Sequence, residues 1–94
     1  LLLPGDVLRF EHGGSTYAIY RTQIGQLFAS DGFCTHGRAH LSDGFLQGTC
    51  IECTKHNGRF EIRNGSVLRP PPRQPLRIYQ ARERDGKVLL NVSL

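Results

Sequence analysis

Apolar and polar residues alternate in short stretches along most of the chain, and turn residues separate these stretches. We find no convincing apolar stripe at helical spacing. The alternation is typical of half-buried strands, and glycine-containing turns at short intervals favour hairpins. The predicted strands cover residues 6–12, 15–22, 26–30, 44–52 (itself a short hairpin), 58–62, 66–68, 75–84 and 87–92. The pattern therefore predicts an all-β fold, a small antiparallel sandwich or barrel.

Turn residues indicate how these strands are joined. Glycine-containing pairs at 13–14, 47–48, 64–65 and 85–86 each lie between two predicted strands. The pair Asn64-Gly65 is a strong signal for a two-residue turn. Residues 69–75, RPPPRQP, cannot lie inside a sheet, because proline lacks the N–H donor of a strand ladder. We expect an ordered, extended loop there.

The composition is that of an ordinary water-soluble domain. With 94 residues, 38% of them hydrophobic, the chain can form one modest core, and we expect a single domain over residues 1–94. No apolar run approaches the roughly 20 residues needed to cross a bilayer. The chain begins at Leu1 rather than at Met, so we expect that Leu1 is not the true start.

Cysteine and histidine usage points to a metal or a reactive thiol. The chain has three cysteines and four histidines. Three cysteines cannot all pair within one chain, which argues against a secreted disulfide scaffold. We therefore expect a reducing compartment, the cytoplasm.

The net charge of +4 is unevenly spread, because residues 61–94 carry +4, residues 34–60 carry +1 and residues 1–33 carry −1. This excess indicates either a solvated surface rich in arginine or a docking face for an acidic partner. A nucleic-acid partner is not expected, because the basic residues are scattered at strand-like spacings without a recognisable binding motif.

Two segments fit poorly as strands, residues 33–44 and 53–58. These segments, within loops that cover about residues 33–44 and 53–60, hold most of the metal-binding residue types. The first contains Cys34-x-His36 and the second Cys53-x-x-His56, with sixteen residues between the two motifs. A structural zinc site would use Cys34, His36 and two of the residues Cys50, Cys53 and His56. A two-iron, two-sulfide cluster with two cysteine and two histidine ligands also fits.

Cys50 and Cys53 have the spacing of a redox pair. Such a pair usually begins a helix, whereas TCIE resembles a strand that runs into a loop. Because neighbouring residues of a strand face opposite sides, Cys50 and Ile51 should point apart. We expect Cys50 to be a small apolar core residue.

The two motifs and their surroundings resemble the Rieske-type ferredoxins of bacterial aromatic-ring-hydroxylating dioxygenase systems. The similarity includes LSDGFL after the first motif, NGRFEI and NGSVL after the second, the proline loop and the final GKV, and it extends from PGDVLRF to GKVLLNV. The family usually has one more strand before this point. The resemblance implies one [2Fe–2S] cluster, with Cys34 and Cys53 on one iron and His36 and His56 on the other. The imidazoles would face solvent, and two neutral ligands in place of thiolates raise the reduction potential.

The function that this resemblance implies is one-electron transfer, so we do not expect an enzyme. The ferredoxin would take electrons from an NAD(P)H-dependent flavoprotein reductase and pass them to a terminal Rieske non-haem iron oxygenase. Neither nucleic acid nor a membrane is an expected partner. The alternative is a zinc-stabilised all-β binding module with a basic docking face.

The residues around the two motifs indicate a low-potential class. Respiratory Rieske proteins have an additional cysteine after each motif, and these two cysteines form a disulfide between the loops. They also place Ser and Tyr hydroxyls near the sulfurs. Here Arg38 and Ala39 follow the first motif, and positions 55, 58 and 60 are Lys, Gly and Phe. We expect no disulfide between the loops. The second motif, CTKHNGRF, also lacks the tryptophan of oxygenase Rieske domains, which favours a mobile carrier.

The remaining residues of interest have more than one interpretation. We expect His40 to be a loop histidine without a ligand role and His12 to be solvated. Residues Gly37, Gly44 and Gly58 are expected to permit tight loops around the cluster. The proline loop is either a lid over the cluster or a plain crossover. Arg38, Lys55 and Arg59 flank the motifs and could tune the potential, meet a partner or be solvated. Many ferredoxins of this kind are acidic, so the basic excess is a departure from the resemblance.

Overall fold

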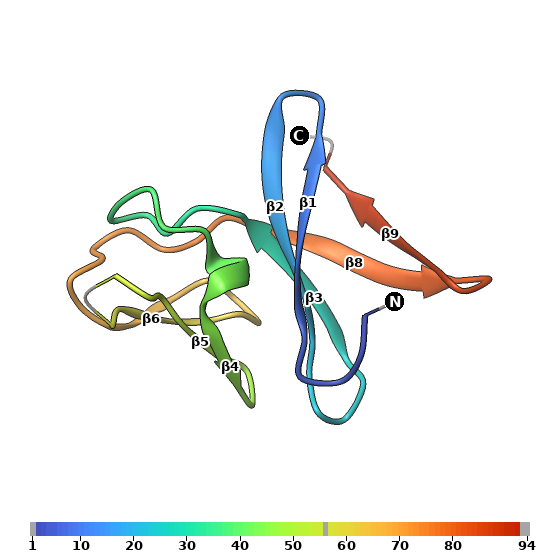
Figure 1. Ribbon diagram of the computed structural model, residues 1–94, viewed down its shortest axis with the longest axis horizontal. Coiled ribbons are helices and arrows are strands. Elements are labelled where there is room, and N and C mark those ends of the chain that lie inside the picture. The colour runs from blue at the N-terminus through green and yellow to red at the C-terminus, as the bar shows by residue number, and fades with distance from the viewer. Residues whose placement is uncertain (1, 56, 93–94) are drawn as a thin grey trace.

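The computed structural model describes residues 2–55 and 57–92, which form two antiparallel sheets (Figure 1). The strands are β1 (Val7–His12), β2 (Ser15–Arg21), β3 (Leu27–Asp31), β4 (Phe45–Gln47), β5 (Cys50–Glu52), β6 (Arg59–Glu61), β7 (Val67–Arg69), β8 (Ile78–Arg84) and β9 (Lys87–Asn91). A single 3-10 turn, η1 (Leu41–Asp43), is the helical element of these residues. The predicted all-β fold is confirmed. Nowhere in the described ranges is there a helix long and apolar enough to span a bilayer.

The five-stranded sheet has the order β1-β2-β3-β8-β9, and the four-stranded sheet has the order β4-β5-β6-β7. Strands β3 and β8 are paired through Ala29 with Tyr79 and Ser30 with Ile78. Residues 32–77 therefore leave the larger sheet at the end of β3 and return beside it on β8. The smaller sheet and the two candidate loops all belong to this excursion.

The hydrophobic core lies between the two sheets. Its largest fully buried side chains are Tyr20 from β2, Phe60 from β6, Leu41 from η1, Ile51 from β5 and Ile62. The Tyr20 hydroxyl is 2.7 Å from Ser30 Oγ, so this buried polar group has a partner. Burial raises the pKa of Tyr20 well above its usual range, and the bond to Ser30 offsets part of that rise.

The predicted two-residue turns at Gly13-Gly14 and Asp85-Gly86 are confirmed. His12 pairs with Ser15 across Gly13 and Gly14. Arg84 pairs with Lys87 across Asp85 and Gly86, which both have positive φ, as the favoured two-residue turn requires. His12 is exposed, as expected.

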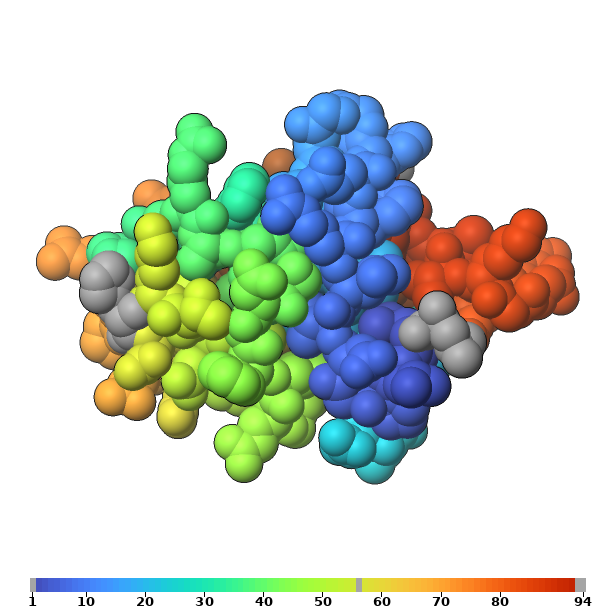
Figure 2. Space-filling view, viewed as in Figure 1, coloured from blue at the N-terminus to red at the C-terminus, as the bar shows by residue number. Residues whose placement is uncertain are grey.

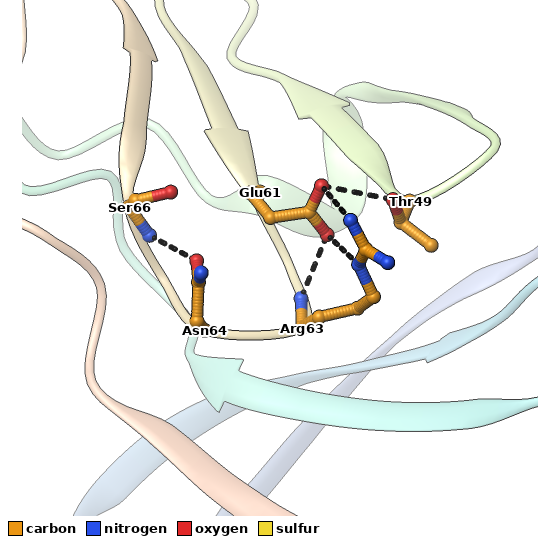
Figure 3. A network of polar contacts seen from close by, with 5 residues as sticks. All are labelled: Thr49, Glu61, Arg63, Asn64 and Ser66. Carbon is orange, nitrogen blue, oxygen red and sulfur yellow. Dashed lines mark hydrogen bonds and ion pairs between the residues drawn. The ribbon is translucent and has the colours of Figure 1, made fainter.

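The predicted two-residue turn at Asn64-Gly65 is wrong. Strands β6 and β7 pair through Phe60 and Val67, so the connection is longer (Figure 3). The Asn64 side chain accepts a hydrogen bond from the Ser66 N–H at 2.9 Å. Gly65 is needed for another reason, because a Cβ there would collide with the carbonyl oxygen of Leu76.

Strand β8 begins at Ile78, three residues later than the predicted start at residue 75. Leu76 lies before the strand and is buried in the core, and its N–H donates to the Gly65 carbonyl at 2.8 Å. The backbone of Leu76 is therefore bonded to a turn of the smaller sheet, and the chain joins the larger sheet only at Ile78.

Candidate metal centre

The two candidate loops close in the same way, although they are far apart in the sequence. In the first loop, residues 34–39, the Cys34 N–H donates to the Ala39 carbonyl at 2.9 Å. In the second loop, residues 53–58, the Cys53 N–H donates to the Gly58 carbonyl at 2.7 Å. Each cysteine thus begins a tight loop whose last residue lies five positions later. In Figure 1 both loops lie at the same end of the molecule, together with residues 69–75.

The thiols of Cys34 and Cys53 lie together on the inner side of these loops. The two residues are 5% and 1% exposed and belong to the same core cluster. Burial raises the pKa of the Cys53 thiol, the backbone N–H of Lys55 partly offsets this by a hydrogen bond, and the adjacent Cys34 thiol raises the pKa further. A metal bound to two neighbouring sulfurs stabilises their thiolate forms.

The outer side of the loops carries polar side chains. His36, two residues after Cys34, is exposed, and Thr54 and Lys55, which follow Cys53, are exposed as well. The loops therefore separate donor types, with thiols inside and an imidazole outside. The predicted fourth site residue, His56, lies outside the described residues.

The proline loop, residues 69–75, contacts both candidate loops. The Thr35 hydroxyl donates to the Gln74 carbonyl at 2.7 Å. On the other side, a Cβ added at Gly58 would lie 2.5 Å from Pro72 Cδ. Gly58 and Pro72 are both buried. These two contacts favour a proline loop that acts as a lid, and they argue against a plain crossover.

Of the three glycines expected to permit tight loops, two have that role. Gly44 has no room for a Cβ, which would collide with the Glu52 carbonyl oxygen, and Gly58 has none because of Pro72. Gly37 was wrongly included, since a Cβ there would meet nothing within 4 Å. Its N–H closes a turn onto the Cys34 carbonyl at 3.2 Å, a role that any residue other than proline can fill.

His40 has a structural position that sequence spacing did not reveal. It is 3% exposed, and its Nδ1 accepts from the Ser42 N–H at 3.1 Å, which caps η1. The proton of the neutral ring is then on Nε2, which lies 2.9 Å from Thr16 Oγ1. Burial lowers the pKa of His40, and the Arg9 guanidinium lowers it further. His40 thus fixes the first loop to β2 rather than offering a free ligand.

The expectation that Cys50 is a core residue is wrong. Cys50 is half-buried, whereas its neighbour Ile51 is fully buried. Alternation along β5 puts Cys50 on the outer face of the smaller sheet. There burial raises the pKa of the Cys50 thiol, and the nearby Arg59 partly offsets this. All three cysteines are free thiols, so the structure contains neither a Cys50–Cys53 disulfide nor a disulfide between the loops.

Arg59 is also less available than the sequence indicated. Its Nε donates to Glu52 Oε1 at 2.9 Å, so it is paired on the outer face of the smaller sheet. The Glu61 carboxylate on this face is likewise bonded, to Arg63 and Thr49 (Figure 3). Several Arg63 contacts hold the pKa of Glu61 below its usual value.

Comparison with known proteins identifies the family. The family model of the Rieske [2Fe–2S] domain matches residues 1–80. The chain belongs to the Rieske family. Its cofactor is one Rieske-type [2Fe–2S] cluster, and the buried thiol pair with an exposed imidazole beside it suits the mixed sulfur and nitrogen ligation of such a cluster. The zinc interpretation finds no support in these comparisons.

Relatives of this Rieske chain include ferredoxin components of dioxygenase systems. It is 38% identical over 92 residues to the ferredoxin component of the naphthalene 1,2-dioxygenase system of Pseudomonas putida, covering 98% of this chain and 88% of the relative. It is 40% identical over 91 residues to the biphenyl dioxygenase ferredoxin subunit of Pseudomonas sp. strain KKS102, covering 96% and 83%.

The same fold is found in a solved complex of reduced oxygenase and oxidised ferredoxin in carbazole 1,9a-dioxygenase. The matching chain superposes with a TM-score of 0.87 at 35% identity, covering 96% of this chain and 92% of that chain. The named relatives are carriers in multicomponent systems rather than the catalysts of those systems.

Proposed function

We propose that this chain is an electron-transfer ferredoxin. It carries single electrons on a low-potential Rieske cluster from an NAD(P)H-dependent flavoprotein reductase to a terminal aromatic-ring-hydroxylating oxygenase. The support is that relatives similar over nearly the whole chain are ferredoxin components of such systems, together with the fold shared with a ferredoxin bound to its oxygenase. We further propose a single domain over residues 1–94 that works in the cytoplasm and contacts neither nucleic acid nor a membrane.

The ligand set in this proposal is Cys34 and Cys53 for one iron and His36 and His56 for the other. The observation that carries it is the buried contact between the Cys34 and Cys53 thiols, with His36 exposed on the adjoining loop. A cluster with two thiolates on its inner iron and imidazoles on its outer iron would fit this division of donors.

The cluster supplies one-electron redox chemistry, and the chain holds it and controls access to it. Burial of both cysteines excludes water from the thiolates, and the Lys55 N–H donates to Cys53 Sγ. Donation to a sulfur stabilises negative charge there. The exposed ring of His36 offers the path to an electron partner, while the proline loop covers the adjoining side.

The side chains near the thiols support the low-potential class. Rieske potentials range from roughly −150 to +300 mV, and hydrogen bonds to the sulfurs set the position within that range. Phe60 is fully buried and has no hydroxyl, and Gly58 beside Pro72 offers only backbone groups. We therefore expect a potential near the lower end of the range, and a value well above zero would contradict the proposal.

Spectroscopy of the purified holoprotein tests the function and the ligands together. The protein should be red-brown and give a rhombic EPR signal when reduced by one electron. His36→Ala should lose the cluster because a donor is removed, whereas Cys50→Ser should keep it because Cys50 lies on the outer sheet face. A colourless protein with one zinc would refute the proposal, and loss of the cluster in Cys50→Ser would refute the ligand set.

A further inference from the structure

The three loops at the cluster end carry an unbalanced positive charge. Residues 33–39, 53–58 and 69–75 contain no aspartate or glutamate. Their four exposed cations, here named the cationic rim, are Arg38, Lys55, Arg69 and Arg73.

The rim is one surface rather than three separate segments. The first loop is bonded to the proline loop through Thr35 and Gln74, and the second loop touches it through Gly58 and Pro72. The first and second loops meet at their cysteines. Figure 2 shows the corresponding green, yellow and orange segments side by side at one end of the molecule.

Nothing in the described parts of the chain neutralises these cations. The four ion pairs found there use Arg9, Arg21, Arg59 and Arg63, and none uses a rim residue. Glu52 and Glu61, the carboxylates of the neighbouring sheet, are already paired with Arg59 and Arg63. Within the described residues, the rim is thus a cationic surface without counter-ions.

We infer that the cationic rim is the docking surface for an acidic patch on the terminal oxygenase. This inference rests on the proposed function, because it assumes that an oxygenase accepts the electron. The transfer takes one electron from the reduced ferredoxin cluster, which becomes fully ferric, and adds it to the oxidised Rieske centre of the oxygenase. His36 is exposed on the same loop as Arg38, so a partner seated on the rim lies next to the exit path of the electron.

Charge complementarity decides the kind of partner. Oppositely charged surfaces raise the rate of encounter, and like charges brought face to face reject a wrong partner. A surface with four unpaired cations therefore favours carboxylate-rich oxygenase surfaces and disfavours basic ones. Because exposed charges are screened over about 8 Å at physiological salt, this preference should weaken as ionic strength rises.

Stopped-flow oxidation of the reduced holoferredoxin by the purified terminal oxygenase of its own system tests the inference. The test variant is Arg38→Glu/Arg73→Glu. The matched control is Arg82→Glu/Arg84→Glu, which changes the net charge equally on β8, whose hairpin with β9 lies at the opposite end of the molecule (Figure 1). Cluster absorbance, the reduction potential and the rate of oxidation by a neutral quinone are measured for each protein.

For the wild type, the second-order rate constant should fall at least about tenfold between low and high ionic strength. The rim variant should react at least about tenfold more slowly than wild type at low ionic strength, whereas the control should stay within about twofold. The cluster absorbance, the reduction potential and the rate of oxidation by quinone of the rim variant should match those of wild type.

Three results would overturn the inference. They are a wild-type rate that is independent of salt, a rate that rises with salt, and equal slowing of the rim and control variants. Failure of the proposed function gives a different result. In that case reduced wild-type ferredoxin reacts with the quinone but is not oxidised by the oxygenase at any ionic strength.

Discussion

Replacing Gly58 by alanine tests how firmly the proline loop is fixed against the second loop. The added Cβ would lie 2.5 Å from Cδ and 2.7 Å from Cγ of Pro72. Carbon atoms pack best at about 3.5–4.0 Å, so the ring must move by about 1 Å. A proline ring cannot rotate away from its own backbone, and Pro72 is buried. The loop itself must therefore shift.

Overpacking of this kind costs about 1–3 kcal/mol. For a domain of this size, that corresponds to a fall in Tm of at least about 4 °C. The matched control is Gly37→Ala in the first loop, where a Cβ meets nothing within 4 Å. Thermal unfolding followed by circular dichroism and by cluster absorbance measures both variants. Equal Tm values for Gly58→Ala and Gly37→Ala would refute the assignment of a tight contact between the two loops.

Two further substitutions examine the bonds around the site. Thr35→Val removes the hydroxyl that donates to Gln74, so it should lower the free energy of unfolding by about 0.5–1.5 kcal/mol in chemical denaturation. The control is Thr54→Val, the matching position after Cys53, which should lower it less. Equal effects of the two variants would contradict the role of the Thr35–Gln74 bond. His40 is held neutral, with its pKa below the usual value because of burial, so the unfolded chain takes up a proton first as the pH falls. The stability that His40 contributes is complete above about pH 6.5 and is lost below it, at up to about 1.4 kcal/mol per pH unit. Denaturation between about pH 7.5 and 5.5 should show this slope, and a His40→Gln variant with the same slope would show that another group titrates.

The sequence predicted the strands best where the turn chemistry is local. Gly13-Gly14 and Asp85-Gly86 adopt the positive φ values of two-residue turns, and both hairpins formed as predicted. Asn64-Gly65 has an equally strong local signal, but the approach of Leu76 determines the backbone there. A contact between residues eleven apart outweighs the preference of a dipeptide, and no local rule contains it.

Site residues divide in the same way between local and distant causes. The motif spacing brought Cys34 and Cys53 to attention, and the structure places them together in the core. Alternation correctly predicted that Cys50 and Ile51 face opposite sides of the strand, but it does not determine which side faces the core. In the structure the larger apolar side chain, Ile51, is the buried one. The bond between Thr35 and Gln74 spans 39 positions, so only the tertiary fold reveals it.

The excursion of residues 32–77 makes the molecule a scaffold with an inserted module. Because Ala29 pairs with Tyr79 and Ser30 with Ile78, the chain leaves and re-enters the larger sheet at adjacent points. Closing a long insertion depends only weakly on its length, since doubling the length costs about 0.6 kcal/mol. Exposed residues of this module can therefore change in number without disturbing the strand register of the scaffold, whereas Leu41, Ile51 and Phe60 are constrained because they share one core with Tyr20. Docking specificity, which depends on exposed loop residues, can thus evolve separately from the stability of the core that both sheets share.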